Sequence, residues 1–364
     1  MKLVIFGLSV SSAWGNGHAT FWRALIRALA RRGHEVVFLE RDLPDHAAYR
    51  DLYELPDAHL VIYRDWREAL PQVRRHLGDA DVAMVTSRCP DGLAATGMML
   101  ESRARVRVLY DLDTPITLRK AAEREPAFYL GPRGLGDFDL VLSFTGGEAL
   151  GALRGRLGAR TVAPLYGAVD PEAHRPVPPT PEYMADVSYL GVCTEDRREG
   201  LERLLIEPAR RLPERRFLVG GARCPEGARW PANVAFAGYV TPAEYPAFHC
   251  SSRLALNVTR PAMAESGYCP SVRLFEAAAC GVVMLSDGWE GLNTFFEPGS
   301  EILIARTADD VEQAVAMDDA QLERVGQAAR RRALEEHTAD RRAREMIDAL
   351  DAAAAATAGR PGGA

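Results

Sequence analysis

Short runs of apolar residues recur along the chain, and segments with apolar positions at helical spacing lie between most of them. A continuous apolar run of this length is typical of a strand buried on both faces of a parallel sheet. The segment 19–32 is one such helical segment, and Gly33 ends it. Repeated strand–helix units predict parallel sheets with helices on both faces. The predicted strands are 3–8, 35–39, 59–63, 82–86, 106–110, 140–144 and 160–165, then 187–190, 216–219, 234–236, 253–258, 282–285 and 302–304.

The alternation stops once, between the seventh and eighth apolar runs. Five of the eleven residues in 171–181 are prolines, which neither continue a helix nor donate to a sheet ladder. We therefore expect two doubly wound α/β halves joined by a stiff connector. Further helices are predicted at 200–211, 242–250, 271–280 and through 309–355. The expected organisation is a first domain at 1–168, a hinge at 169–182, a second domain at 183–334, a helix at 335–352 that packs back on the first domain, and a disordered tail at 353–364.

Composition narrows the class of protein. A chain of 364 residues favours two domains, and 47% hydrophobic with 26% charged residues is typical of a soluble globular protein. No run reaches the ~18 apolar residues that span a bilayer. The start of the chain imitates a signal peptide, but a first strand fits it better, so we expect a cytoplasmic protein. A net charge of −6 without a basic run disfavours nucleic-acid binding.

The six cysteines show no C-x-x-C spacing, which argues against a zinc site or a redox pair. We expect reduced and mostly buried thiols. No residue is assigned to a metal.

The loop after the first predicted strand carries candidate chemistry. Its glycines allow a ligand to approach the backbone, and the following helix N-terminus favours an anion. An ordinary surface loop is the alternative, although tryptophan and histidine are costly residues in a plain turn. The candidate phosphate or acceptor residues here are Trp14, Gly15, Asn16 and Gly17. His18 can take a proton from a hydroxyl near neutral pH, so we treat it as a possible general base.

The same loop partly matches a dinucleotide-binding fingerprint. Gly15 and Gly17 supply two of its glycines, and Glu40 ends the second strand as a possible ribose acceptor. Thr20 stands where the third glycine belongs. An NAD(P)-dependent dehydrogenase is therefore the alternative enzyme class.

Two aspartates close the fifth predicted strand. Ligands of open α/β sheets bind beyond the carboxyl ends of the strands, so Asp111 and Asp113 are expected near His18. One of the carboxylates could orient the imidazole and stabilise its charged form. A metal-binding D-x-D and plain helix capping are the alternatives. The sixth strand also leads into a glycine turn, where Thr145 and Gly146 either contact an acceptor or only form the turn.

The second half holds the strongest stretch of candidate residues. A strand ends near Asn257, a loop with Gly267 follows, and a short helix begins at Ser271. The free N–H groups of that helix suit a diphosphate, and Arg273 adds a fork of donors. Glu276 lies on the same helix face and can accept two hydrogen bonds from vicinal ribose hydroxyls. An exposed Arg273–Glu276 pair of little energetic value is the alternative.

Other donor-site candidates surround this helix. Tyr268 and Val272 flank its start. Thr194, Arg197 and Arg198 follow the first strand of the second half, where a loop can touch phosphates, although a solvated charge run fits them as well.

Several motifs together resemble the CgeB-like glycosyltransferase family, which has the GT-B fold. They are PSVRLFEAAACG at 270–281, LSDGWEG at 285–291, FEPGSEI at 296–302, SAWGNGHA at 12–19 and YDLDTP at 110–115. The resemblance covers residues 1 to about 345. It implies two Rossmann-like domains that face a central cleft, with the sugar donor on the second and the acceptor on the first.

The resemblance also implies roles for particular residues. Glu276 would bind the ribose, the turn at 271–273 the diphosphate, and His18 would be the base with Asp113 or Asp111 as its partner. Many retaining members carry two glutamates eight residues apart, but Tyr268 stands eight residues before Glu276. The nearer acid, Glu265, is eleven residues away, which leaves inverting and retaining chemistry open.

The function expected from these observations is a metal-independent hexosyl transfer from a nucleoside-diphosphate sugar to an acceptor hydroxyl, with no cofactor besides the donor. A nicotinamide-dependent dehydrogenase, a non-catalytic nucleotide-sugar-binding protein and a GT-B sugar epimerase are the alternatives.

Overall fold

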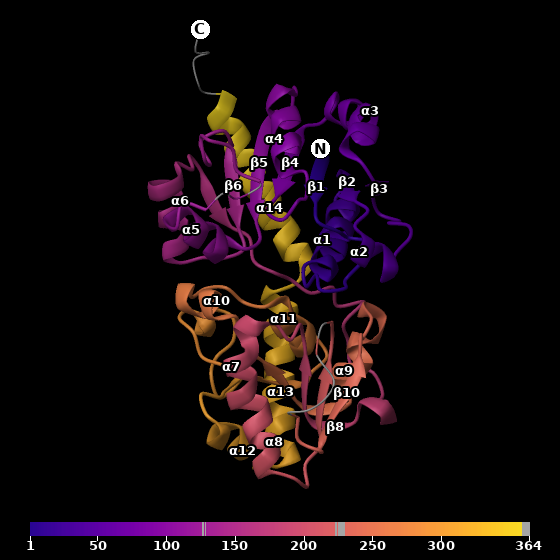
Figure 1. The fold of residues 1–364 in the computed structure, drawn as a ribbon, viewed down its shortest axis with the longest axis vertical. Helices are drawn as coiled ribbons and strands as arrows, with labels where there is room; N and C mark the ends of the chain where they lie inside the picture. Colours follow the sequence, from indigo (N-terminus) through magenta and orange to yellow (C-terminus); the bar gives the residue numbers. More distant parts are fainter. Residues whose placement is uncertain (126, 128, 223, 225–229, 359–364) are drawn as a thin grey trace. The chain divides into compact units, whose positions relative to one another are not determined.

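The protein divides into two compact units. The structure, a computed structural model, describes residues 1–125, 127, 129–222, 224 and 230–358. The first unit contains Met1–Ser12, Trp22–Tyr166 and the segment from Ala339 onward, and the second contains Ala13–Phe21 and Gly167–Thr338. Each unit is a parallel sheet with helices packed on it (Figure 1). The predicted fold class of two parallel α/β halves with C-terminal helices is confirmed.

The described residues of the first unit form a seven-stranded parallel sheet in the order β3-β2-β1-β4-β5-β6-β7. Its central strands are almost wholly buried, as continuous apolar runs require. In the first unit, helix α1 buries Trp22, Leu25 and Leu29 on one face. The elements are β1 (Lys2–Gly7), α1 (Ala19–Arg31), β2 (Glu35–Arg41), α2 (Pro44–Ala48), β3 (His59–Tyr63), α3 (Trp66–Leu77), β4 (Val82–Thr86), α4 (Gly92–Glu101), β5 (Val106–Asp111), α5 (Thr114–Ala122), β6 (Leu140–Ser143), α6 (Glu148–Leu157), β7 (Val162–Pro164) and α14 (Ala339–Ala358).

The described residues of the second unit form a six-stranded parallel sheet in the order β10-β9-β8-β11-β12-β13. All thirteen predicted strands of the two units are present within a few residues of their expected positions. The elements are β8 (Ala185–Leu190), α7 (Arg198–Leu201), a π-helical turn (Glu202–Ile206), α8 (Glu207–Arg211), β9 (Phe217–Gly220), β10 (Val234–Gly238), α9 (Tyr245–Cys250), β11 (Ser252–Asn257), α10 (Pro261–Ser266), α11 (Val272–Ala279), β12 (Val283–Ser286), β13 (Leu303–Ile304), α12 (Ala308–Ala316) and α13 (Asp319–Glu336).

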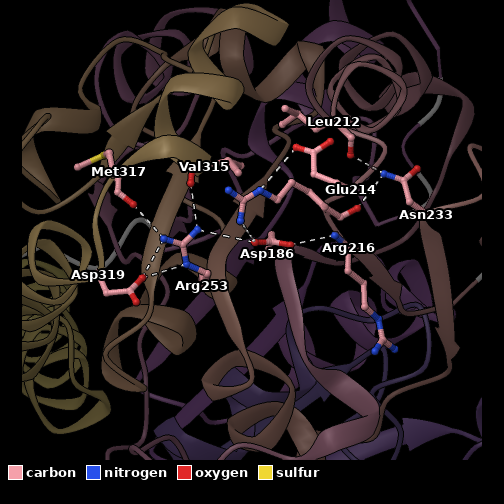
Figure 2. A network of polar contacts seen from close by, with 10 residues as sticks. Asp186, Leu212, Glu214, Arg216, Asn233, Arg253, Val315, Met317 and Asp319 are labelled. Atoms are coloured by element: carbon pink, nitrogen blue, oxygen red, sulfur yellow. Dashed lines mark hydrogen bonds and ion pairs between the residues drawn. The ribbon is translucent and has the colours of Figure 1, made fainter.

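A polar network fixes the amino-terminal edge of the second sheet (Figure 2). Arg253, on β11, donates hydrogen bonds to the carbonyl oxygens of Val315 and Met317 at the end of α12 and to the carboxylate of Asp319 at the start of α13. Asp186 of β8 accepts from the backbone N–H of Arg216 at 2.9 Å. These contacts hold the helix connections against the strand starts and leave the opposite, carboxyl edge of the sheet for the loops described below.

Two of the places where the chain passes from one unit to the other, after Tyr166 and after Thr338, are next to segments that contact each other within the second unit. The backbone N–H of Val169 donates to the carbonyl of His337 at 3.0 Å, and Val169 forms an isolated parallel β-bridge with Thr338. The proline-rich segment that follows is held on the second unit, because Thr180 donates its N–H to Ser251 and Val177 donates its N–H to the thiol of Cys250.

The last residues of the C-terminal segment differ from their prediction. Helix α14 belongs to the first unit and lies beside β5 (Figure 1, yellow). It buries an apolar stripe of Ala343, Met346 and Leu350. The expected disordered tail is wrong for residues 353–358, which complete this helix; their low complexity comes from alanine, the strongest helix former. Residues 359–364 lie outside the described part of the chain.

The expectation of reduced cysteines is wrong for one pair. Cys193 and Cys224 form a disulfide with an S–S distance of 1.99 Å. It joins the loop after β8 to the loop after β9 at the carboxyl edge of the second sheet. Cys89, Cys269 and Cys280 are buried thiols and Cys250 is half-buried. The two bonded residues lie 31 positions apart, so no short spacing could pair them.

Candidate functional site

The candidate donor site lies at the carboxyl edge of the second sheet. Strands β8 and β11 are neighbours there, although β9 and β10 follow β8 in the chain and pack on its other side. Such a switch in strand order opens a crevice between the loops that leave the two strands, where open α/β sheets bind ligands. The loop after β8 carries Thr194 and Arg197, and β11 ends at Asn257.

Helix α11 begins at this edge. Ser271 is its N-cap, and its hydroxyl accepts the N–H of Arg273 at 3.4 Å. Every residue of the helix except Arg273 is buried, including Val272 and the run of alanines at its end. Small residues let this helix pack closely, so its N-terminal N–H groups and its two charged side chains are fixed by the core.

Glu276 is a buried carboxylate with spare hydrogen-bonding capacity. The residue is 1% exposed, and Oε1 accepts a hydrogen bond from the hydroxyl of Thr20 at 2.6 Å. Thr20 belongs to the segment Ala13–Phe21 of the second unit. The Nε2 atom of His174 lies 3.8 Å from Oε1. Within the described residues, Oε2 has no hydrogen-bond partner. The alternative of an exposed Arg273–Glu276 pair is therefore wrong.

Arg273 lies against the glycine loop. A Cβ atom on Gly17 would be 2.9 Å from an Nη atom of Arg273, so the glycine makes room for the guanidinium. Burial lowers the pKa of Arg273, whereas the nearby Tyr245 and Glu276 raise it. Together the raising effects are larger, so the pKa lies above its usual value. Arg273 is thus a fixed cation one turn away from a partly paired carboxylate.

Arg197 and Arg198 have different surroundings. Arg197 donates from Nε to the carbonyl of Val258 at 3.2 Å and from Nη1 to that of Val192 at 3.4 Å, which ties the loop after β8 to the loop after β11. Burial lowers its pKa. Arg198 instead pairs with Glu195 at 3.1 Å, and both side chains are strongly exposed. For Arg198 the structure therefore favours an exposed, solvated ion pair over a phosphate contact.

Side chains next to these loops form a second small network. Asn257 donates to Ser286 at 3.0 Å and to Thr259 at 3.2 Å. The hydroxyl of Thr259 donates to Asp287 at 2.7 Å. Burial raises the pKa of Asp287. Thr194 donates to Asp196, which pairs with Arg260 at 2.7 Å.

The loop before α11 is clamped to the loop after β12. Gly267 has φ +66°, and a Cβ there would be 2.8 Å from the carbonyl oxygen of Glu290. Tyr268 also has a positive φ, +46°, which is unusual for a bulky residue. Its N–H donates to Glu290 at 2.7 Å, and its ring packs against Gly291. Tyr268, which stands eight residues before Glu276, therefore sits in a constrained backbone.

Thr20 and His174 are contacts of Glu276 that the sequence did not reveal. The one feature of the sequence that drew attention to Thr20 was its place in the glycine fingerprint, where a third glycine was expected. Glu276, which accepts its hydrogen bond, lies 256 positions further along the chain. His174 lies in the proline-rich segment, is 5% exposed and shows no motif.

In the first unit, the two predicted aspartates lie together at the end of β5. Asp111 is fully buried and accepts the N–H of Asp113 at 3.2 Å. Burial raises the pKa of Asp111 to about 6. Asp113 is the N-cap residue of α5, and its carboxylate lies 3.4 Å from a guanidinium nitrogen of Arg88.

His18 belongs to the second unit and is half-buried. Its backbone N–H donates a hydrogen bond to the side-chain oxygen of Asn16 at 3.2 Å. Trp14 is half-buried, and Gly15 is exposed with φ +61°. The partnership of His18 with Asp113 or Asp111 stays a prediction.

Glu40 is occupied by the loop after β1. Its carboxylate accepts the N–H groups of Val10 at 2.5 Å and of Ser11 at 3.1 Å, together with the hydroxyls of Ser9 and Ser11. A carboxylate offers about four acceptor positions. Glu40 therefore has no capacity left for ribose hydroxyls, which argues against the dinucleotide interpretation of this loop.

Thr145 and Gly146 form a tight turn. Thr145 is fully buried, and its N–H donates to the hydroxyl of Ser143 at 3.1 Å. A Cβ on Gly146 would be 2.0 Å from the Tyr166 hydroxyl, so packing accounts for this glycine. An acceptor contact at this turn stays a prediction.

Two general features concern the described part of the chain. No helix there is both long and apolar enough to span a bilayer. No group of three or more histidine, cysteine, aspartate or glutamate side chains gathers there in a way that could hold a metal ion.

The fold and part of the sequence match known proteins. Sucrose-phosphate synthase from Thermosynechococcus elongatus aligns over 98% of this chain and 100% of that one, with a TM-score of 0.70 and 14% identity. HepE from Anabaena, solved with UDP-glucose, aligns over 97% of this chain and 100% of HepE, with a TM-score of 0.64 and 14% identity. An α-glucosyltransferase solved with UDP and DNA aligns over 96% of this chain and 99% of that enzyme, with a TM-score of 0.66 and 13% identity.

The chain has the GT-B fold. Residues 197–348, which include α11, match the family model described as glycosyl transferase-like. The solved structures show the fold alone, and the family model shows a glycosyl transferase-like sequence over residues 197–348. A search of curated proteins gives no significant match. The narrower CgeB-like assignment stays a prediction, and so does the absence of nucleic acid among its partners.

Proposed function

We propose that the protein is a metal-independent glycosyltransferase that moves a hexosyl group from a nucleoside-diphosphate sugar to an acceptor hydroxyl. The CgeB-like group is the family branch that its motifs favour. The observation that carries the proposal is Glu276, a buried carboxylate with an unpaired oxygen, three residues after Arg273 on a helix that begins at the strand switch. Vicinal hydroxyls of a ribose are the donors that such an oxygen accepts.

The reaction can be written with the residues of this chain. The acceptor oxygen attacks the anomeric carbon, and the bond from that carbon to the diphosphate oxygen breaks. The N-terminal N–H groups of α11 and the guanidinium of Arg273 stabilise the charge that develops on the diphosphate. His18 takes the proton of the acceptor hydroxyl, and Asp113 or Asp111 stabilises the resulting imidazolium. These groups supply the stabilisation that a metal would otherwise give.

The experiment compares UDP, dTDP, GDP, ADP and NADH in thermal shift assays of the full chain. A ligand at ~100 times its Kd adds about 2.7 kcal/mol of stability, which shifts the melting temperature by several degrees. We expect one nucleoside diphosphate to stabilise the protein and its sugar conjugate to be consumed in a transfer or hydrolysis assay.

Each other outcome would contradict the proposal in a distinct way. Stabilisation by NADH alone would favour the dehydrogenase. It would also contradict the conclusion that Glu40 has no free acceptor position for a ribose. Binding of a nucleotide sugar without transfer or hydrolysis would favour a non-catalytic binding protein, and its conversion to another sugar an epimerase.

A further inference from the structure

A small cavity lies behind α11, inside the second unit. It is enclosed by β8, β11 and β12 on the sheet side and by α9 and α11 on the helix side. Leucine, alanine and methionine side chains form much of its wall. The polar side chains that line it are Ser188, His249, Asn257 and Arg273.

Four polar atoms of these lining residues are buried without a hydrogen-bond partner in the described part of the chain. They are Oγ of Ser188, both ring nitrogens of His249 and Nε of Arg273. Ser188 is 1% exposed and His249 is 3% exposed. Each unpaired buried polar group costs about 1–3 kcal/mol, and native proteins rarely tolerate several of them at one place. Their gathering around one cavity points to a shared hydrogen-bonding partner.

The chemistry of the three side chains defines that partner. Burial, reinforced by the nearby His174 and Arg273, lowers the pKa of His249 to about 3, so its ring is neutral. A neutral imidazole offers one N–H donor and one acceptor nitrogen, and the serine hydroxyl both donates and accepts. Nε of arginine only donates. A species that both accepts and donates hydrogen bonds can pair with all three side chains.

Water has this capacity and fits the space. A buried water usually makes about three hydrogen bonds, and the cavity has room for about one molecule of that size. It could accept from Nε of Arg273, donate to the acceptor nitrogen of His249 and exchange a hydrogen bond with Ser188. A larger ligand would not fit, and a nonpolar one would leave the four atoms unpaired.

We propose that this cavity binds one water molecule that links His249 and Ser188 to Arg273, and that His249 is thereby a positioning residue for the donor diphosphate. Because a guanidinium is planar, a hydrogen bond at Nε fixes the plane in which both Nη groups lie. The water and His249 thus aim the fork of donors that meets the phosphates. The inference rests on the proposed function, because that function places the diphosphate at Arg273.

The test uses two substitutions of His249 and a matched control. His249→Phe keeps a ring but removes both nitrogens, whereas His249→Gln keeps one donor and one acceptor. His76 is a buried histidine of the first unit with an unpaired Nδ1 and a pKa that burial lowers. His76→Phe therefore reproduces the loss of a buried imidazole far along the chain from the donor site. Calorimetric titration with UDP, dTDP, GDP and ADP gives the Kd for the nucleotide that the wild type binds.

We expect His249→Phe to weaken nucleotide binding about tenfold, the usual effect of one lost hydrogen bond. His249→Gln should recover most of that loss, and His76→Phe should leave the Kd unchanged. In an Arg273→Ala background, His249→Phe should have no further effect, because the group that it positions is gone. If His249→Phe does not fold, Ser188→Ala, which removes one partner of the water, should weaken binding two- to threefold.

The outcomes separate this inference from the proposed function. Wild-type affinity in His249→Phe, or an equal loss in His76→Phe, would overturn the positioning role while the proposed function stands. A crystal structure of the wild type should show one water peak within hydrogen-bond distance of Nε of Arg273. Density for chloride or no density would overturn the water site. If the wild type binds no nucleoside diphosphate, the proposed function and the positioning role both fail, and the crystal density alone decides the water.

Discussion

Substitution of Glu276 by glutamine should weaken nucleotide binding and leave the protein as stable as before or more so. The carboxylate is 1% exposed, accepts one hydrogen bond from Thr20 and has His174 at 3.8 Å, while Oε2 is unpaired in the described structure. An incompletely paired buried charge is costly, and its neutral replacement is often neutral or stabilising. Glutamine keeps an oxygen for the Thr20 hydroxyl.

The magnitudes follow from these contacts. A hydrogen bond to a charged group contributes about 1.5–3 kcal/mol. Glutamine loses the charge and one acceptor position but can still pair with ribose hydroxyls, so we expect about one such contribution to be lost. That corresponds to roughly a 10- to 100-fold higher Kd. For the fold, we expect a gain of up to ~1 kcal/mol, or a rise in Tm of roughly 2–4 °C.

The assay pairs isothermal titration calorimetry for the bound nucleotide with scanning calorimetry of the free protein. Glu265→Gln is the matched control, because Glu265 is exposed and is the other glutamate of the same region. It should change neither quantity. Wild-type affinity in Glu276→Gln would refute the ribose assignment. A loss of stability above ~1 kcal/mol would refute the conclusion that the buried carboxylate is under-paired.

Three further predictions address other parts of the protein. His18→Ala should lower turnover by at least ~100-fold with donor affinity retained, because a general base contributes about that much; steady-state kinetics with normal kcat would remove it as the base. The pKa of Asp111 is raised by burial to about 6, above its unfolded value, so stability should fall as the pH rises from 4 to 6, by on the order of 3 kcal/mol. Denaturant titrations should show no such fall in Asp111→Asn, and an equal fall in both proteins would contradict the assignment. Closure of a 31-residue separation by Cys193–Cys224 should contribute about 3–4 kcal/mol, so Cys193→Ser should lower the urea midpoint, and an unchanged midpoint in dithiothreitol-treated wild type would count against the bond.

The strands were predictable because a parallel sheet demands continuous apolar runs, and few other structures do. The positions of the candidate site residues were predictable only where they depend on neighbours in sequence. Ser271 caps α11 because the helix begins one residue later, and Glu276 shares a face with Arg273 for the same local reason. Both could be placed from spacing alone.

The remainder depends on contacts between distant residues. Glu40 resembled a ribose acceptor, but the partners that occupy it lie about 30 positions earlier. Gly146 resembled a ligand turn, and only the position of Tyr166 shows that packing requires it. The Thr20–Glu276 hydrogen bond and the disulfide of Cys193 likewise have no local signal.

The route of the chain has a consequence for its synthesis. Domains usually fold as units in the order in which the ribosome delivers them. Here the first unit depends on α14, which buries Met346 and Leu350 and begins only after the second unit has ended at Thr338. The nascent first unit must therefore wait, with the face that α14 covers exposed, until the second unit and then α14 have been translated. A gene truncated after Tyr166 would make that waiting state permanent, so chaperone capture and aggregation are the expected fate of such a fragment.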